Sequence, residues 1–227
     1  DLKPPLNIYF SGYRPAEGFE GFVMMRRMGS PFILFSDPRL EGGSFYMGSQ
    51  ELEDQIVAYI DQHLDWLGFG PKEMNFSGLS MGTFGALYYG ASYSPHAILV
   101  GKPIINLGDV AANLKFKRPD EFGTSLDMMQ LLVGQVSREG IDLLNQRFWN
   151  RFNQADLKDT ILALAYMRDD DYDQLAYPKI LEALYDHPVR IISSSRPGRH
   201  NDATAPIVEW FLTQYKEIME RDFGRIE

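Results

Sequence analysis

The sequence predicts an α/β protein in which a mostly parallel sheet is covered by helices on both faces. Two observations lead to this fold class. Short apolar runs, most of them rich in β-branched or aromatic residues, recur along the whole chain, and segments with apolar residues at helical spacing separate most of them. Strands that alternate with helices in this way form parallel sheets whose two faces are both buried.

The elements follow one another in a regular order. Six strands are expected, each a short run near turn residues: 6–10, 32–35, 74–77, 97–100, 161–165 and 189–193. Four helices are expected between and after them: 51–67, 82–90, 174–186 and 204–221. The first helix has Leu52 and Ile56 on its apolar face and stops at Gly68, whereas the last has Ile207 and Phe211 on its apolar face.

The segment from 102 to 158 interrupts this alternation. It is polar and contains two helical patterns but no convincing strand, and Ile141, Leu144 and Phe148 line one side of the second helix. Because it is inserted between two core strands on the carboxyl side of the sheet, we expect it to form a helical cap over a pocket.

Composition narrows the class of protein. The 227 residues fit one domain with an ample core, and 44% of them are apolar. The absence of Cys excludes a disulfide scaffold, a thiolate zinc site and a cysteine nucleophile, and it fits a cytosolic location. A net charge of −9 argues against a nucleic-acid partner, and no apolar run is long enough to cross a bilayer. Because the chain starts at Asp1 rather than Met, we expect it to be one domain of a longer protein.

The strongest chemical motif is Gly78-Leu79-Ser80-Met81-Gly82. A Gly-x-Ser-x-Gly match alone is weak, because these residue types are common. Here a strand runs into the motif and a helix of small residues leaves it, which is the context that places a serine on a sharp, exposed corner. Ser80 is therefore the predicted nucleophile, with an ordinary small-residue turn as the alternative.

A serine at its ordinary pKa needs a general base, and the sequence offers four histidines. His63 lies in an amphipathic helix, His96 precedes a strand, and His187 lies in a turn that contains Pro. His200 instead follows the last strand, which places it at the same edge of the sheet as Ser80. We predict that His200 is the base and that the other three histidines have surface or packing roles.

A run of aspartates after the strand at 161–165 supplies candidates for the acid that would orient His200. The chain order is then Ser, Asp, His, which is the order of α/β-hydrolases. The acid of that fold follows its strand by several residues, so Asp170 is the predicted acid and Asp171 the reserve. At least three of the four aspartates between 169 and 173 are expected to be solvated loop residues, and no metal-binding spacing is present.

An acyl-transfer site also needs N–H groups that stabilise an oxyanion. The Met81 N–H is one candidate by position. The loop after the first strand supplies the other, with the N–H of Gly12 or Tyr13 favoured, although a plain turn fits this loop as well. Arg14 could contact an anionic or polyhydroxyl substrate, but an exposed arginine is the commoner outcome.

One family resembles the chain over essentially its whole length. The residues that carry the resemblance are Asn7-Ile8-Tyr9-Phe10-Ser11-Gly12-Tyr13-Arg14, the stretch 18–21 and the serine motif. The family is the second of three accessory secretory proteins with which Gram-positive bacteria export serine-rich repeat adhesins, and the match is to its C-terminal domain. The resemblance implies an α/β-hydrolase fold, with Ser80 as nucleophile and His200 as base. The family's acid is a glutamate where this sequence offers Asp170, and its members carry a preceding portion with a β-sandwich module.

The resemblance also implies an activity and partners. It implies an O-acetyltransferase that modifies N-acetylglucosamine of the adhesin glycan, needs an acetyl donor and no other cofactor, and takes part in export with the first and third accessory secretory proteins. The implied location is the cytoplasm, with a peripheral position at the translocase on the inner face of the membrane as a further option. Two alternatives stay open: a serine carboxylesterase that hydrolyses small acyl esters, and a hydrolase-like scaffold that holds export partners.

Overall fold

The computed structural model describes residues 2–14, 18–40, 43–121 and 123–225. Its centre is a six-stranded sheet in which every neighbouring pair is parallel, with the strand order β2-β1-β3-β4-β5-β6. The strands are β1 (Leu6–Phe10), β2 (Phe32–Phe35), β3 (Met74–Leu79), β4 (Ala97–Gly101), β5 (Ile161–Met167) and β6 (Arg190–Arg196). The predicted α/β class is confirmed, and all six expected strands are present.

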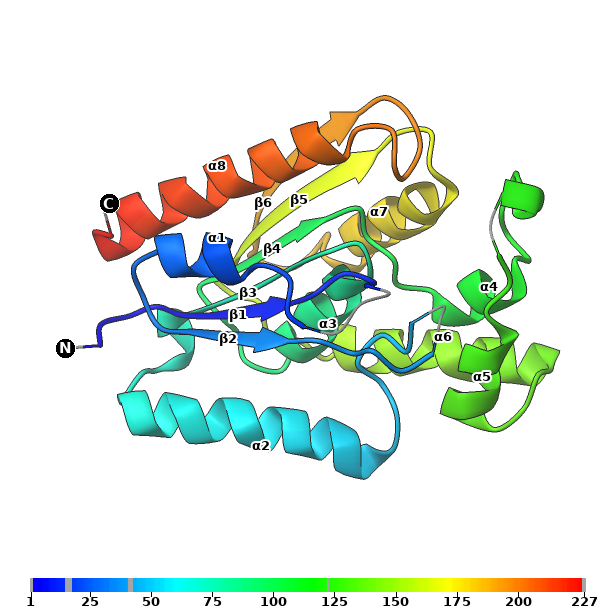
Figure 1. The fold of residues 1–227 in the computed structure, drawn as a ribbon, viewed down its shortest axis with the longest axis horizontal. Coiled ribbons are helices and arrows are strands. Elements are labelled where there is room, and N and C mark those ends of the chain that lie inside the picture. Colours follow the sequence, from blue (N-terminus) through cyan, green and yellow to red (C-terminus); the bar gives the residue numbers. More distant parts are fainter. Residues whose placement is uncertain (1, 15–17, 41–42, 122, 226–227) are drawn as a thin grey trace.

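Helices cover both faces of this sheet (Figure 1). They are α1 (Phe22–Arg27), α2 (Gln50–Leu67), α3 (Met81–Gly90), α4 (Leu107–Ala112), α5 (Leu126–Val133), α6 (Arg138–Phe152), α7 (Asp171–Ala183) and α8 (Thr204–Phe223). The helices α1 and α8 lie on one face, and α2, α3, α6 and α7 lie on the other. The sequence did not predict α1 or α4, because a helix of six residues is too short to show a periodic pattern.

The strands divide their side chains between two cores, as the alternation along a β-strand requires. In β1, Ile8 and Phe10 belong to the core under α2 and α3, whereas Tyr9 belongs to the core under α1 and α8. Phe211 of α8 lies in this second core. Both faces of the central strands are therefore buried, and the functional groups gather at the strand ends.

The inserted segment packs into the first of these cores. Leu107, Met128 and Leu144, from α4, α5 and α6, are buried in the same cluster as the sheet residues. The rings of Phe148 in α6 and Phe84 in α3 lie 5.5 Å apart. The insertion is thus fixed against the helix that begins at the serine motif. Within the part of the chain that the structure describes, no helix has both the length and the apolar character needed to span a membrane.

Candidate active site

Ser80 lies on a tight corner between β3 and α3. Its φ of 53° and ψ of −121° are unusual for a residue with a side chain, and such a conformation costs about 1–3 kcal/mol. The Ser80 N–H donates to the Gly101 carbonyl at the end of β4. A Cβ on Gly78 would lie 2.2 Å from the Gly82 carbonyl oxygen, so the corner closes only because both flanking residues lack side chains. This geometry turns the serine hydroxyl outward at the carboxyl edge of the sheet.

His200 reaches Ser80 from the loop between β6 and α8. Its Nε2 lies 2.8 Å from Ser80 Oγ, although 120 residues separate the two in the sequence. The Tyr172 ring packs edge-on against the imidazole, and only 16% of the His200 side chain is exposed. This hydrogen-bonded pairing is the arrangement that a serine nucleophile and a histidine base require. Two of the other histidines are engaged elsewhere: His63 contacts the Tyr59 carbonyl, and His96 contacts the Asp222 carboxylate.

Asp170 lies behind His200 and is fully buried. Its Oδ2 accepts from the His200 backbone N–H at 2.7 Å, and its Oδ1 accepts from the N–H groups of Tyr172 and Asp173 at the start of α7. The distance from Oδ1 to His200 Nδ1 is 3.9 Å, which is too long for a hydrogen bond. Asp170 therefore ties the His200 loop to α7 through the backbone, and the imidazole Nδ1 has no hydrogen-bond partner among the described residues.

The prediction that most of these aspartates are solvated is wrong. Asp173 is fully buried and accepts from the Met167 N–H, and Asp171 is 6% exposed and accepts from the Arg118 N–H of the insertion. Only Asp169 is exposed, and it accepts from the Gly198 N–H. The physical reason is that a backbone N–H group satisfies each buried carboxylate: the first turn of α7 donates to Asp170, whereas Met167 and Arg118 donate to Asp173 and Asp171.

The burial of the pair, more than the charges around it, favours a neutral imidazole. Burial lowers the pKa of His200 to about 3, and the nearby Lys102 ammonium adds to this effect. Burial likewise raises the pKa of Asp170, although backbone N–H groups oppose the shift. A neutral histidine is the form that can accept the serine proton.

Lys102 is a feature of the site that the sequence analysis missed. It follows β4 directly with a φ of 58°, is buried, and donates to Thr204 Oγ1 at 3.2 Å. Burial lowers its pKa, whereas the facing carboxylates of Asp173, Glu20 and Asp170 oppose that shift. One feature of the sequence could have identified Lys102. It is the first residue after a buried strand, and parallel sheets bind ligands at the edge where their strands end.

The three predicted oxyanion donors have different surroundings. Met81 is the first residue of α3, so its N–H lies outside the hydrogen-bond ladder of that helix. The Gly12 N–H is already engaged, because it donates to Glu20 Oε2 at 2.6 Å. Tyr13 is the next residue along the loop and has a half-exposed side chain. Arg14, the predicted substrate contact, is partly exposed on the same loop.

A cavity of about 420 Å³ lies on the Tyr172 side of the site, and neither Ser80 nor His200 lines it. It is bordered by Tyr13 of the first loop, by Tyr172, whose ring touches His200, and by the insertion. The insertion contributes Gly123, Thr124, Ser125, Asp127 and Met128. The inserted segment was expected to cover a pocket, and its residues 123–128 border this one.

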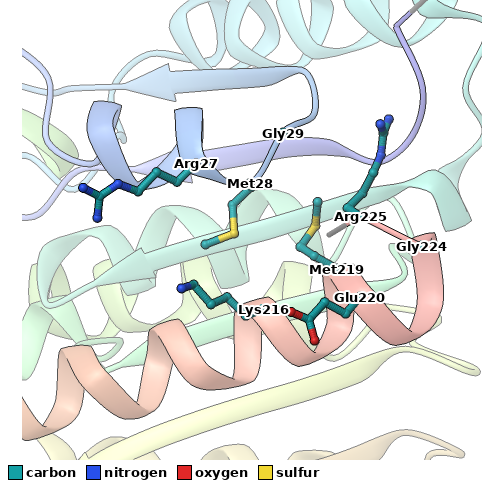
Figure 2. A pocket seen from close by; sticks show the side chains of 8 residues that line it. All are labelled: Arg27, Met28, Gly29, Lys216, Met219, Glu220, Gly224 and Arg225. Atoms are coloured by element: carbon teal, nitrogen blue, oxygen red, sulfur yellow. The ribbon is translucent and has the colours of Figure 1, made fainter. Parts of the chain in front are cut away.

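A second cavity, of about 220 Å³, lies far from this chemistry (Figure 2). It is formed between α1 and the end of α8, near the amino ends of β1 and β3, where Arg225 donates to the Pro4 carbonyl. In Figure 2 the side chains of Arg27 and Lys216 extend to the left, whereas the Arg225 guanidinium points upward, away from both. These groups do not converge on a ligand site.

Asp170, Asp173 and His200 offer three ligand atoms within 4.8 Å of one another. Both carboxylates already accept backbone N–H groups, and the Nε2 of His200 faces Ser80. Two of its polar atoms, Asp173 Oδ1 and His200 Nδ1, nevertheless have no hydrogen-bond partner among the described residues.

A parallel sheet with a serine corner after its third strand and a histidine after its last defines the α/β-hydrolase fold, and solved structures agree. The capsule O-acetyltransferase of Neisseria meningitidis serogroup A has a TM-score of 0.72 at 18% identity, over 96% of this chain and 88% of its own. An S-formylglutathione hydrolase from Agrobacterium tumefaciens has a TM-score of 0.61 at 13% identity, over 100% of this chain and 86% of its own. At these identities the likeness shows the fold alone.

Comparisons at higher sequence identity define the protein family, which is more specific than the fold. Residues 1–225 match the accessory Sec system GspB-transporter family, and the chain belongs to it, as the resemblance predicted. Accessory Sec system proteins of Staphylococcus aureus and Streptococcus gordonii are 52% and 47% identical, over 100% and 99% of this chain. A chain of the Glycosylation Associate Protein complex of Streptococcus agalactiae has a TM-score of 0.93 at 48% identity, over all of this chain. This chain spans 44% of the length of each of these three relatives.

Proposed function

We propose that this chain carries a serine-dependent O-acetyltransferase site that acts on N-acetylglucosamine of serine-rich repeat adhesins. The observation that supports it most directly is the 2.8 Å contact between Ser80 Oγ and His200 Nε2 at a strained strand–helix corner. A serine in this conformation, hydrogen-bonded to a neutral and buried histidine, has the features of a nucleophile in acyl transfer. The choice of sugar and adhesin rests on membership of the family.

The proposed reaction has two halves. Ser80 Oγ attacks the carbonyl carbon of an acetyl donor while His200 takes the hydroxyl proton, and the donor group leaves with that proton. The acetyl-serine ester is then attacked by a sugar hydroxyl, whose proton passes to His200 and from there to Ser80 as the ester bond breaks. Backbone N–H groups beside Ser80 stabilise the negative charge on the carbonyl oxygen in both halves. The cavity of about 420 Å³ beside Tyr13 and Tyr172 offers a place for the acceptor sugar.

The proposal extends to partners and location. We place the protein in the cytoplasm, at the inner face of the membrane, together with the first and third accessory secretory proteins. The related chain from Streptococcus agalactiae, which was solved as part of a complex, supports an assembly of this kind.

Transfer can be distinguished from hydrolysis with the wild-type protein. We expect acetate from an aryl acetate to appear on N-acetylglucosamine, or on the glycosylated adhesin, when measured by mass spectrometry. Release of aryl alcohol and free acetate without any acetylated sugar would favour the carboxylesterase alternative. If neither product forms and export still requires the protein, the scaffold alternative gains support.

The pH below which activity is lost should be lower than is usual for an enzyme with a histidine base. His200 acts only when neutral, so a pKa lowered from 6.5 towards 3 by burial keeps the active form present at lower pH. We expect kcat/KM for an aryl acetate to stay constant from pH 8 down to about pH 6 and to fall only below it. The measurement is a pH profile with a stability check at each pH. A fall in kcat/KM that is centred at or above pH 6.5 would show that Asp170 moves to stabilise the charged imidazole.

A further inference from the structure

The peptide unit between Ser11 and Gly12 is held at both of its polar ends. Its carbonyl oxygen, on Ser11, accepts from the Tyr46 hydroxyl at 2.5 Å. Its N–H, on Gly12, donates to Glu20 Oε2 at 2.6 Å. Because a peptide unit is planar, two hydrogen bonds on opposite sides fix its rotation. This peptide is part of the loop from which the second oxyanion donor is expected.

Glu20 is itself fixed in place. Its backbone N–H donates to Ser11 Oγ at 3.2 Å. Burial and the nearby Glu20 carboxylate raise the pKa of the Tyr9 phenol. The next residue, Gly21, has a φ of 85°, and a Cβ there would lie 2.9 Å from the Tyr9 ring. The chain therefore needs glycine at 21 to bring the Glu20 carboxylate back onto the loop.

The carboxylate lies close to the nucleophile. A Cβ built on Gly12 would be 3.3 Å from Glu20 Oε2 and 3.9 Å from Ser80 Cβ. The positive charge of Lys102 also faces Glu20. Only Gly12 therefore lies between the Glu20 carboxylate and Ser80.

An oxyanion cannot use the Gly12 N–H while a carboxylate occupies it, because the two negative charges would compete for one donor. The next N–H of the loop belongs to Tyr13, and the orientation of the fixed Ser11–Gly12 peptide restricts where it points. We propose that Glu20 is a positioning residue that holds this peptide and so leaves the Tyr13 N–H, with that of Met81, to stabilise the oxyanion. This inference rests on the proposed acyl-transfer function.

The test is the rate at which a fluorophosphonate labels Ser80 in the full-length protein, because phosphonylation also develops charge on an oxygen. Glu20→Gln keeps an oxygen that accepts from the Gly12 N–H, so we expect it to stay within about threefold of wild type. Glu20→Ala removes the contact, and Glu20→Asp shortens its reach while keeping the charge. We expect both to lower the maximal labelling rate by about 10- to 100-fold with little change in reagent affinity. Glu217→Ala, at an exposed glutamate of α8, is the matched control and should label like wild type.

Each alternative outcome has a distinct pattern. Faster labelling of Glu20→Ala would mean that the carboxylate blocks the site. An equal loss of labelling rate in Glu20→Gln and Glu20→Ala would mean that the charge or basicity of Glu20 matters. Either result overturns the inference. Labelling of Glu20→Ala and Glu20→Asp at the wild-type rate would also overturn it while the proposed function stands. If Glu20→Ala does not fold, the comparison of Glu20→Asp with Glu20→Gln decides. Wild-type protein that is never labelled at Ser80 would overturn the proposed function itself, and the inference with it.

Discussion

Replacing Ser80 with Ala should lower acetyl transfer and aryl acetate hydrolysis by at least about 10⁴-fold. The substitution removes the atom that forms the acyl intermediate, and water bound near His200 is a poor substitute for a fixed nucleophile. Folding should change little, because the loss is one hydrogen bond of 2.8 Å to His200, worth about 1 kcal/mol. The measurements are the initial rate of product formation and the thermal unfolding midpoint of the same preparation.

The control for this variant is Ser92→Ala, at an exposed serine just beyond α3. It should leave both the rate and the unfolding midpoint at wild-type values. Residual activity of Ser80→Ala above about 1% of wild type would show that another group carries the acyl chain, or that His200 activates water directly. Loss of export with unchanged adhesin acetylation in the same strain would instead point to the scaffold role.

The serine–histidine pair could be predicted because it depends on general properties of parallel sheets. The carboxyl ends of all strands lie at one edge, so a serine after β3 and a histidine after β6 share that edge, although β4 and β5 lie between their strands. The motif around Ser80 also has a local cause, since Gly78 and Gly82 allow the corner to close. Both signals are visible in a short stretch of sequence.

The surroundings of the pair could not be predicted in this way. Nothing local in the aspartate run shows that Asp171 meets the Arg118 N–H or that Asp170 holds the His200 backbone rather than its ring. Glu20 and Lys102 reach the site from a loop and a strand end whose side-chain directions depend on the assembled fold. Periodicity locates elements, but it does not say which polar groups pair across them.

The largest effect on stability is expected from Gly82→Ala. A Cβ at this position would lie 2.0 Å from the Phe10 carbonyl oxygen and 3.1 Å from that of Ser11. Both atoms belong to the backbone at the end of β1, so no side-chain rotation can relieve the clash, and α3 must move away from the sheet. We expect a loss of about 3 kcal/mol or more in the free energy of unfolding.

The matched control is Gly70→Ala, where the nearest atom to the new Cβ is 3.9 Å away and φ is not positive. Urea unfolding should show a lower midpoint for Gly82→Ala and a nearly unchanged one for Gly70→Ala, with similar slopes. Because the same displacement would shift Ser80 and the Met81 N–H relative to the Ser11–Gly12 loop, the folded fraction of Gly82→Ala should also label poorly with a fluorophosphonate. Wild-type stability together with wild-type labelling would contradict the close packing of α3 on β1 that forms the serine corner.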